Sequence, residues 1–178
     1  GPKNIALSAE LCDGWMGLFF SPGFQDFYKD CLNEGFGREG ARSSWDDFDV
    51  TATVPFIVCD DPADGADMLR HYYALYFGGM GAREVNFHNA VAARMGYAEE
   101  AKHIQDLYLD GKKAEAIAAV PTQLVEDTSL IGPAEKIRDD LERWRESVVT
   151  TLLVVLGSVL ADALYAALDP RIRAAERT

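Results

Sequence analysis

The sequence predicts an α/β fold in which parallel strands are joined by helices. Apolar runs typical of buried strands lie at residues 15–20, 48–59 and 148–156. Between them, apolar residues recur at spacings of three and four, which is the pattern of amphipathic helices. The order is helix, strand, helix, strand, several helices and strand, and alternation of this kind implies crossover connections in a helix-rich parallel architecture.

The first half of the chain shows clear element boundaries. A helix is expected over residues 4–12 and ends at Asp13-Gly14, and a second amphipathic helix begins at Phe24 after the first strand. Residues 48–59 are rich in β-branched side chains, as strands are. Pro55 within this strand lacks an N–H, so it predicts a bulge or an unpaired position.

The second half is mostly helical. Asp60-Asp61-Pro62 has the residue types of a helix start, and this helix is expected to run to about residue 77. Residues 86–120 continue as helix with interruptions at Gly96 and Gly111, and another short helix follows Pro121. A further helix is expected to start at residues 131–133, and it leads into the strand at 148–156.

Composition narrows the class of protein. The 178 residues are 48% hydrophobic and 26% charged, as in an ordinary globular domain. The net charge of -12 would repel a nucleic-acid backbone, so nucleic-acid binding is not expected. Cys12, Cys31 and Cys59 form no C-x-x-C pair and no signal peptide precedes them, which favours reduced thiols in the cytoplasm.

Three stretches together resemble the deazaflavin-dependent branch of the luciferase-like monooxygenase superfamily. They follow the order that the family has, and they cover about 150 residues. The stretches are Gly1-Pro2-Lys3-Asn4-Ile5-Ala6-Leu7 with Asp13-Gly14-Trp15, then Ala74-Leu75-Tyr76 with Gly78-Gly79-Met80-Gly81 and Asn86-Phe87-His88, and last Ile131-Gly132-Pro133-Ala134-Glu135-Lys136-Ile137 with Val149-Thr150-Thr151-Leu152-Leu153.

The resemblance implies part of a (β/α)8 TIM barrel, namely strands six to eight with their helices. A complete barrel usually takes ~250 residues, and the first five strands have no counterpart here. The family transfers a hydride between reduced coenzyme F420, a deazaflavin, and a small organic substrate. FMN is the alternative cofactor, and a half-barrel that binds no cofactor is the third expectation.

The resemblance covers residues 1–156 and ends there. Residues 157–178 are expected to form a separate C-terminal helix and tail, and their sequence resembles the end of peptide-type ABC transporter permeases. The apolar run from residue 148 to 168 contains Asp162, and a charge inside a membrane span is costly. A buried strand followed by a core helix is therefore favoured over a membrane span.

The candidate site residues fall in two places, and each has a plain structural alternative. By resemblance, Gly1, Pro2 and Lys3 would bind the cofactor phosphate at a helix start, whereas the alternative is a loose terminus. Gly78, Gly79, Gly81 and His88 would form a substrate or cofactor wall. The alternative for the glycines is a helix–helix connection that needs positive φ, and for the histidine an exposed or capping role.

No catalytic residue is identified by any motif. The three histidines have no second ligand at metal spacing, so no metal site is expected. Two functions stay open: a fragment of a deazaflavin-dependent oxidoreductase, or a catalytically inactive remnant that acts as an oligomerising module. Either would assemble with itself or with the missing half-barrel, because exposed sheet edges favour association.

Overall fold

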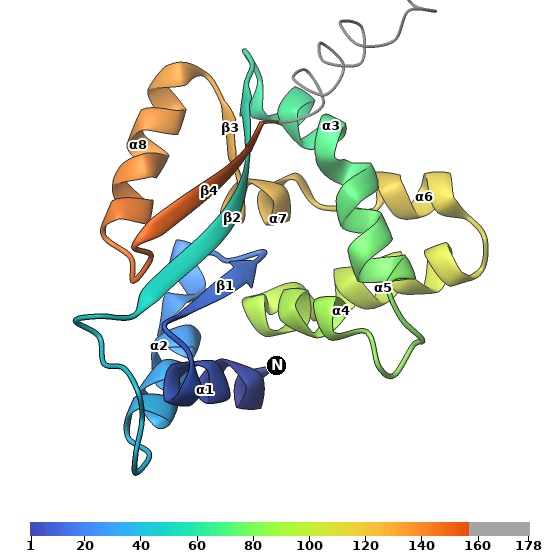
Figure 1. The fold of residues 1–178 in the computed structure, drawn as a ribbon. Helices are drawn as coiled ribbons and strands as arrows, with labels where there is room; N and C mark the ends of the chain where they lie inside the picture. Colours follow the sequence, from blue (N-terminus) through green and yellow to red (C-terminus); the bar gives the residue numbers. More distant parts are fainter. Residues whose placement is uncertain (157–178) are drawn as a thin grey trace, which may run out of the picture.

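The computed structural model describes residues 1–156, and within them four strands form one parallel sheet (Figure 1). The strands are β1 (Gly14–Leu18), β2 (Asp49–Val58), β3 (Leu130–Gly132) and β4 (Thr151–Leu156). Three of them were predicted. The short β3 was not, because residues 131–133 have the residue types of a helix start.

The long strand β2 is the centre of the sheet. Thr51 pairs with Met16 of β1 and with Thr151 of β4, so β1 and β4 lie on opposite edges of β2. Phe56 pairs with Leu130 of β3 and also with β4, so β3 follows β1 along the same edge. The order β1, β2, β4 matches the order expected for barrel strands six, seven and eight.

Pro55 lies where β2 has no neighbour on one edge. The Val50 carbonyl accepts from the Thr150 N–H and the Val50 N–H donates to the Thr150 hydroxyl, beside β4, so the backbone groups of even-numbered β2 residues face β4. The N–H of Cys59 donates to the Gly132 carbonyl, so odd-numbered residues face β1 and β3. Pro55 therefore faces the gap between β1 and β3, which confirms the predicted unpaired position, and the continuous register with β4 shows no bulge.

One face of the sheet is covered by helices. These are α1 (Pro2–Leu11), α2 (Gln25–Phe36) with the short 3-10 turn η1 (Pro22–Phe24), and α8 (Ala134–Arg145). The side chains of Val50, Ala52 and Val54 on β2 are fully buried against them, together with Leu32 of α2 and Trp144 of α8. This first core gives the sheet its outer layer, as in the wall of a barrel.

A second group of helices, residues 62–127, forms what we call the helical cap. It contains α3 (Pro62–Ala74), the π-helical turn η2 (Leu75–Gly79), α4 (Phe87–Ala92), η3 (Ala93–Tyr97), α5 (Ala98–Leu109), α6 (Lys113–Ala118) and α7 (Thr122–Asp127). The predicted breaks at Gly96 and Gly111 are confirmed, since both have positive φ. The cap has its own core, which includes Tyr73 and Phe77.

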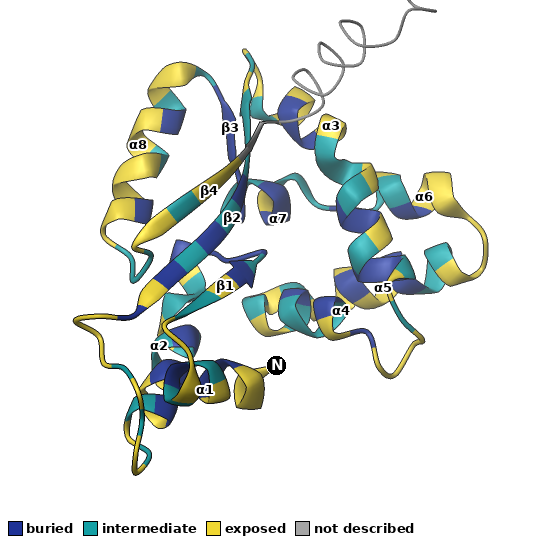
Figure 2. Ribbon diagram, in the orientation of Figure 1, coloured by how far each residue is buried: buried dark blue, intermediate teal, exposed yellow. Residues whose placement is uncertain are grey.

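The face of the sheet opposite α1, α2 and α8 is open. Along β2, buried residues alternate with partly exposed ones (Figure 2). In register with the partly exposed Thr51 and Thr53 lie Met16 of β1, which is 61% exposed, and Leu153 of β4, which is 47% exposed. We call this surface the open inner face, since it corresponds to the inside of a barrel.

The architecture is a partial TIM barrel, as predicted: a helix-rich α/β fold with β1, β2 and β4 as neighbouring parallel strands. Among the described helices, none has the length and apolar character that crossing a bilayer requires. The expected C-terminal helix and tail at 157–178 lie outside the described residues, as does most of the apolar run around Asp162.

Candidate functional site

A cavity of about 260 Å³ lies at the carboxyl ends of β1 and β2, beneath α3 of the helical cap. Its walls combine strand and helix residues, and most of them are apolar. The lining residues are Leu18, Phe19, Thr53, Pro55, Phe56, Ile57, Met68, Leu69, His71, Tyr72 and Thr128. The carboxyl ends of the strands are the functional end of a TIM barrel, so this is the natural candidate site.

Phe19 directly follows β1 and lies at the centre of an aromatic cluster. Its φ of 59° is left-handed, a conformation that costs a bulky residue about 1–3 kcal/mol. The ring is only 2% exposed and contacts Tyr72, Tyr73, Tyr76, Phe77 and His88, at centroid distances of 4.8 to 5.9 Å. This packing holds the strained turn in place and fixes one wall of the cavity. No pattern in the sequence pointed to this residue.

His88 is part of the same aromatic cluster. Its side chain is buried, and its ring makes an edge-to-face contact with Tyr76 at 4.8 Å. Burial lowers the pKa of His88, and the α-amino group of Gly1 lowers it further, so the ring is neutral near pH 7. The alternative of an exposed or capping histidine is wrong: Asn86 caps α4 and accepts a hydrogen bond from the His88 N–H.

The glycine segment is shaped by helix packing. A Cβ on Gly78 would lie 2.5 Å from Cβ of Tyr108 on α5, and one on Gly79 would lie 2.5 Å from Cε1 of the same ring. Only Gly81 has positive φ, at 153°. The expected connection between helices is therefore present, but close approach to Tyr108, more than backbone freedom, explains the first two glycines.

Gly1, Pro2 and Lys3 form the start of α1 and are exposed. A Cβ on Gly1 would meet no atom within 4 Å, so this helix start leaves room for an anion. The α-amino group of Gly1 contributes to the lowered pKa of His88, which indicates that the helix start and the aromatic cluster are on the same side of the molecule. Two candidate places that are 87 residues apart in the sequence thus lie on one side of the molecule.

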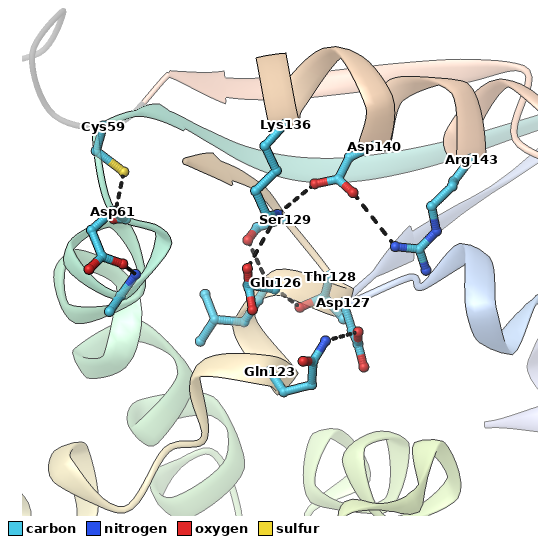
Figure 3. A network of polar contacts seen from close by, with 12 residues as sticks. Cys59, Asp61, Gln123, Glu126, Asp127, Thr128, Ser129, Lys136, Asp140 and Arg143 are labelled. Carbon is cyan, nitrogen blue, oxygen red and sulfur yellow. Dashed lines mark hydrogen bonds and ion pairs between the residues drawn. The ribbon is translucent and has the colours of Figure 1, made fainter. Parts of the chain in front are cut away.

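A network of charged groups links α7 to α8 (Figure 3). The Lys136 Nζ lies 2.7 Å from Asp140 and 3.3 Å from Glu126, and Arg143 reaches Asp140 at 3.6 Å. Burial opposes the charge on Lys136, but the hydrogen bonds and charges of Asp140 and Glu126 outweigh it and raise the lysine pKa. These four charges are paired with one another, so the ion pairs fasten α7 of the cap to α8 and leave none of the four as a free acid or base.

In residues 1–156, no three His, Cys, Asp or Glu side chains are grouped as metal ligands, so a metal site has no support there.

His71 is a candidate site residue that the sequence did not indicate. It lies on α3, lines the cavity and is exposed, but no motif surrounds it in the sequence that would have indicated a role. Only the position of α3 above the strand ends brings it to the site.

Comparison with known proteins identifies the family. The sequence profile described as "Luciferase-like monooxygenase" matches residues 1–151. The chain belongs to this family. The luciferase-like resemblance seen in the sequence is thereby confirmed.

Known members of the family and solved structures agree with this assignment. "Putative coenzyme F420-dependent oxidoreductase Rv3520c" of Mycobacterium tuberculosis is 42% identical over 158 residues, which are 89% of this chain and 46% of that protein. The F420-dependent tetrahydromethanopterin reductase of Methanopyrus kandleri shares the fold, with a TM-score of 0.66 and 22% identity over 89% of this chain and 43% of that one.

A further solved structure shares the fold at greater distance. It is an F420-dependent secondary alcohol dehydrogenase in complex with an F420-acetone adduct, with a TM-score of 0.59 and 14% identity over 97% of this chain and 47% of that one. The luciferase-like chain described here therefore spans about half the length of the relatives that it matches.

Proposed function

We propose that this chain supplies strands six to eight of a deazaflavin-dependent oxidoreductase, which transfers a hydride between reduced coenzyme F420 and a small organic substrate. The observation that carries the proposal is 42% identity to a relative named for F420-dependent oxidoreduction. The cavity at the carboxyl ends of β1 and β2 supports it, because TIM-barrel enzymes bind their ligands at that end.

The described residues fit one end of this cofactor. Coenzyme F420 has a deazaflavin ring, which exchanges the hydride, and an anionic side chain with a phosphate. Gly1, Pro2 and Lys3 would hold the phosphate, because an open helix start and a lysine both attract anions. His88, neutral and held against Tyr76, would form part of the wall on that side.

Of the glycines in the proposed wall, Gly81 has positive φ and lies close to Asn86, whose Cα would be 3.1 Å from a Cβ at this position. Gly78 and Gly79 are turned to Tyr108, so we assign their contribution to packing. FMN also carries a phosphate on its side chain, and the same helix start would attract it. A titration with each cofactor separates the two cases.

The test is a titration of the purified chain with F420 and, in parallel, with FMN, followed by absorbance and fluorescence. We expect saturable F420 binding that Lys3→Gln weakens roughly two- to fivefold, the effect of one charge at a helix start. The matched control is Lys112→Gln, an exposed lysine far along the chain in the helical cap. No saturable binding at high micromolar F420 would exclude this function for the chain on its own.

A second function is favoured by the open inner face. Met16 and Leu153 expose apolar side chains there, and among the described residues the strands β1 and β4 pair only with β2. Unpaired edges and exposed apolar surface promote association. We therefore propose, as the alternative, a catalytically inactive module that oligomerises with itself or with a partner supplying the other strands.

Light scattering coupled to size exclusion decides whether the module oligomerises. Dimers or larger assemblies that dissociate when Leu153 is changed to Lys would support the alternative. A compact monomer at all concentrations would contradict it. We also propose a cytoplasmic location, which the three cysteines Cys12, Cys31 and Cys59 support because they form no disulfide in residues 1–156.

A further inference from the structure

The cavity beneath α3 has an apolar interior, and the imidazole ring of His71 lies at its mouth. Phe19 and Thr128 lie deepest and are 2% and 1% exposed. Met68 is 58% exposed, and His71, one helical turn later on α3, is also exposed. A molecule entering the cavity would therefore pass Met68 and His71 before it reached Phe19.

The size of the cavity limits what it can hold. A dry apolar cavity of about 150 Å³ accommodates benzene, so a cavity of about 260 Å³ has room for roughly ten non-hydrogen atoms by the same proportion. A tricyclic deazaflavin ring with its side chain is larger than this. The cavity therefore suits a small molecule that lies beside the cofactor better than it suits the cofactor.

The lining chemistry favours a neutral ligand. None of the lining residues is Asp, Glu, Lys or Arg. The Thr128 hydroxyl is already engaged, with the Tyr73 hydroxyl at 2.6 Å and the Leu124 carbonyl at 2.9 Å. Burial raises the pKa of Tyr72 to about 12, so its hydroxyl stays uncharged. A cation in this cavity would lose hydration without gaining a carboxylate partner, and an anion would find no Lys or Arg.

His71 is the polar side chain at the mouth that a ligand can use. An imidazole has at least one N–H donor in either protonation state, so it can always donate to an oxygen acceptor. It lines the cavity from α3, above the ends of β1 and β2, so its donor is within the cavity's lining. The combination is a mainly apolar pocket with the His71 donor at its rim and the hydroxyls of Thr53 and Tyr72 also in its lining.

We propose that this cavity binds a small, neutral, mainly hydrocarbon molecule that carries a carbonyl or hydroxyl oxygen, and that His71 orients it by donating a hydrogen bond to that oxygen. This inference rests on the proposed function, for which it names the substrate class. His71 is here a substrate-binding residue of the cavity, in addition to any group that the rest of a barrel contributes.

The test uses the full chain without any deazaflavin, so a failed cofactor titration and a failed substrate site are distinguished. Cyclohexanone, cyclohexane and cyclohexylammonium are titrated against isotope-labelled protein, and methyl and imidazole resonances are followed by NMR. We expect saturable binding of cyclohexanone and cyclohexane, with shifts at Leu18, Ile57 and Leu69. Cyclohexanone alone should also shift the His71 ring, and cyclohexylammonium should not bind.

Variants of the cavity residues distinguish a hydrogen bond from His71 to the ligand from a purely steric role of His71. His71→Ala should weaken cyclohexanone binding roughly three- to tenfold, the effect of one hydrogen bond, and leave cyclohexane binding unchanged. His103→Ala is the matched control, because His103 is an exposed histidine on α5 and does not line the cavity. Met68→Trp, at the exposed mouth, should block all binding while the spectrum of the folded chain is retained.

Three results would overturn the proposal. One is the absence of saturable cyclohexanone binding to the folded wild-type chain. The other is an equal loss of cyclohexanone and cyclohexane binding in His71→Ala, which would show that His71 only shapes the cavity. Tight binding of cyclohexylammonium would likewise contradict a site for neutral molecules.

Discussion

Alanine at Gly78 and at Gly79 should have different consequences, although the two residues are adjacent. Alanine at Gly79 meets Cε1, Cζ and Cδ1 of Tyr108, all of which belong to the ring. Alanine at Gly78 meets Cβ of Tyr108 at 2.5 Å, close to the α5 backbone. A ring can rotate aside, whereas a Cβ moves only with its helix.

The expected sizes follow from these contacts. Overpacking costs about 1–3 kcal/mol, and alanine recovers up to about 1 kcal/mol over glycine in a helix. We expect Gly79→Ala to lower the free energy of unfolding by about 1 kcal/mol and Gly78→Ala by about 2–3 kcal/mol. Each kcal/mol corresponds to a Tm change of about 2–4 °C for a chain of this size.

A double-mutant cycle with Tyr108→Ala checks the geometry by urea unfolding. Removal of the ring should relieve most of the cost at Gly79 and little of the cost at Gly78, because the Cβ of residue 108 remains. Equal relief at both positions would show that the assignment of contacts is wrong. Unchanged stability in both glycine variants, with loss of F420 binding, would instead make the segment a ligand-binding loop.

Three further perturbations test other parts of the structure. Thr128→Val should cost about 1–3 kcal/mol, because it leaves the buried Tyr73 hydroxyl without its 2.6 Å partner, and adding Tyr73→Phe should recover part of the loss in thermal unfolding. The pKa of His88 is lowered in the folded state, so its stabilising contribution is present above the ordinary histidine pKa of about 6.5 and is lost as the pH falls. Urea midpoints at pH 7.5 and pH 5 should therefore differ less in His88→Phe than in the wild type, whereas His103→Gln should behave as the wild type does. Asp61→Ala should remove the cap of α3, whose carboxylate accepts from the Ala63 N–H at 2.9 Å, and should lower stability by about 1 kcal/mol without changing the slope of the urea transition.

The sequence predicted those helices and strands whose own residue types favour the structure that they adopt in the fold. Strand β2 is long and β-branched, and Asp61 caps α3 as its position before Pro62 indicated. Strand β3 was missed because three residues are too few to show a period, and it exists only through pairing with β2. Its Gly132 has a φ of 120°, which ends the strand just before α8.

The candidate site was predicted only in part. The resemblance directed attention to His88, but its burial depends on Tyr76 and Phe19, which reach it from two other elements. The left-handed turn at Phe19 has no sequence signal, since phenylalanine rarely adopts positive φ. The cavity and His71 depend on where α3 lies above the strand ends, and no local pattern encodes that position.

The helical cap leaves the sheet at the end of β2 and returns to it at β3, beside the point of departure. Cys59, just after β2, is hydrogen-bonded to Gly132 at 3.0 Å, although more than seventy residues separate them. Because the two ends of the cap are tied to each other, its length and sequence can change while the neighbouring strands keep their register. Substitutions or grafts within residues 62–127 would therefore change the helices above the strand ends while the strands of the barrel wall stay as they are. Ligand specificity could be altered in this way, by evolution or by protein engineering.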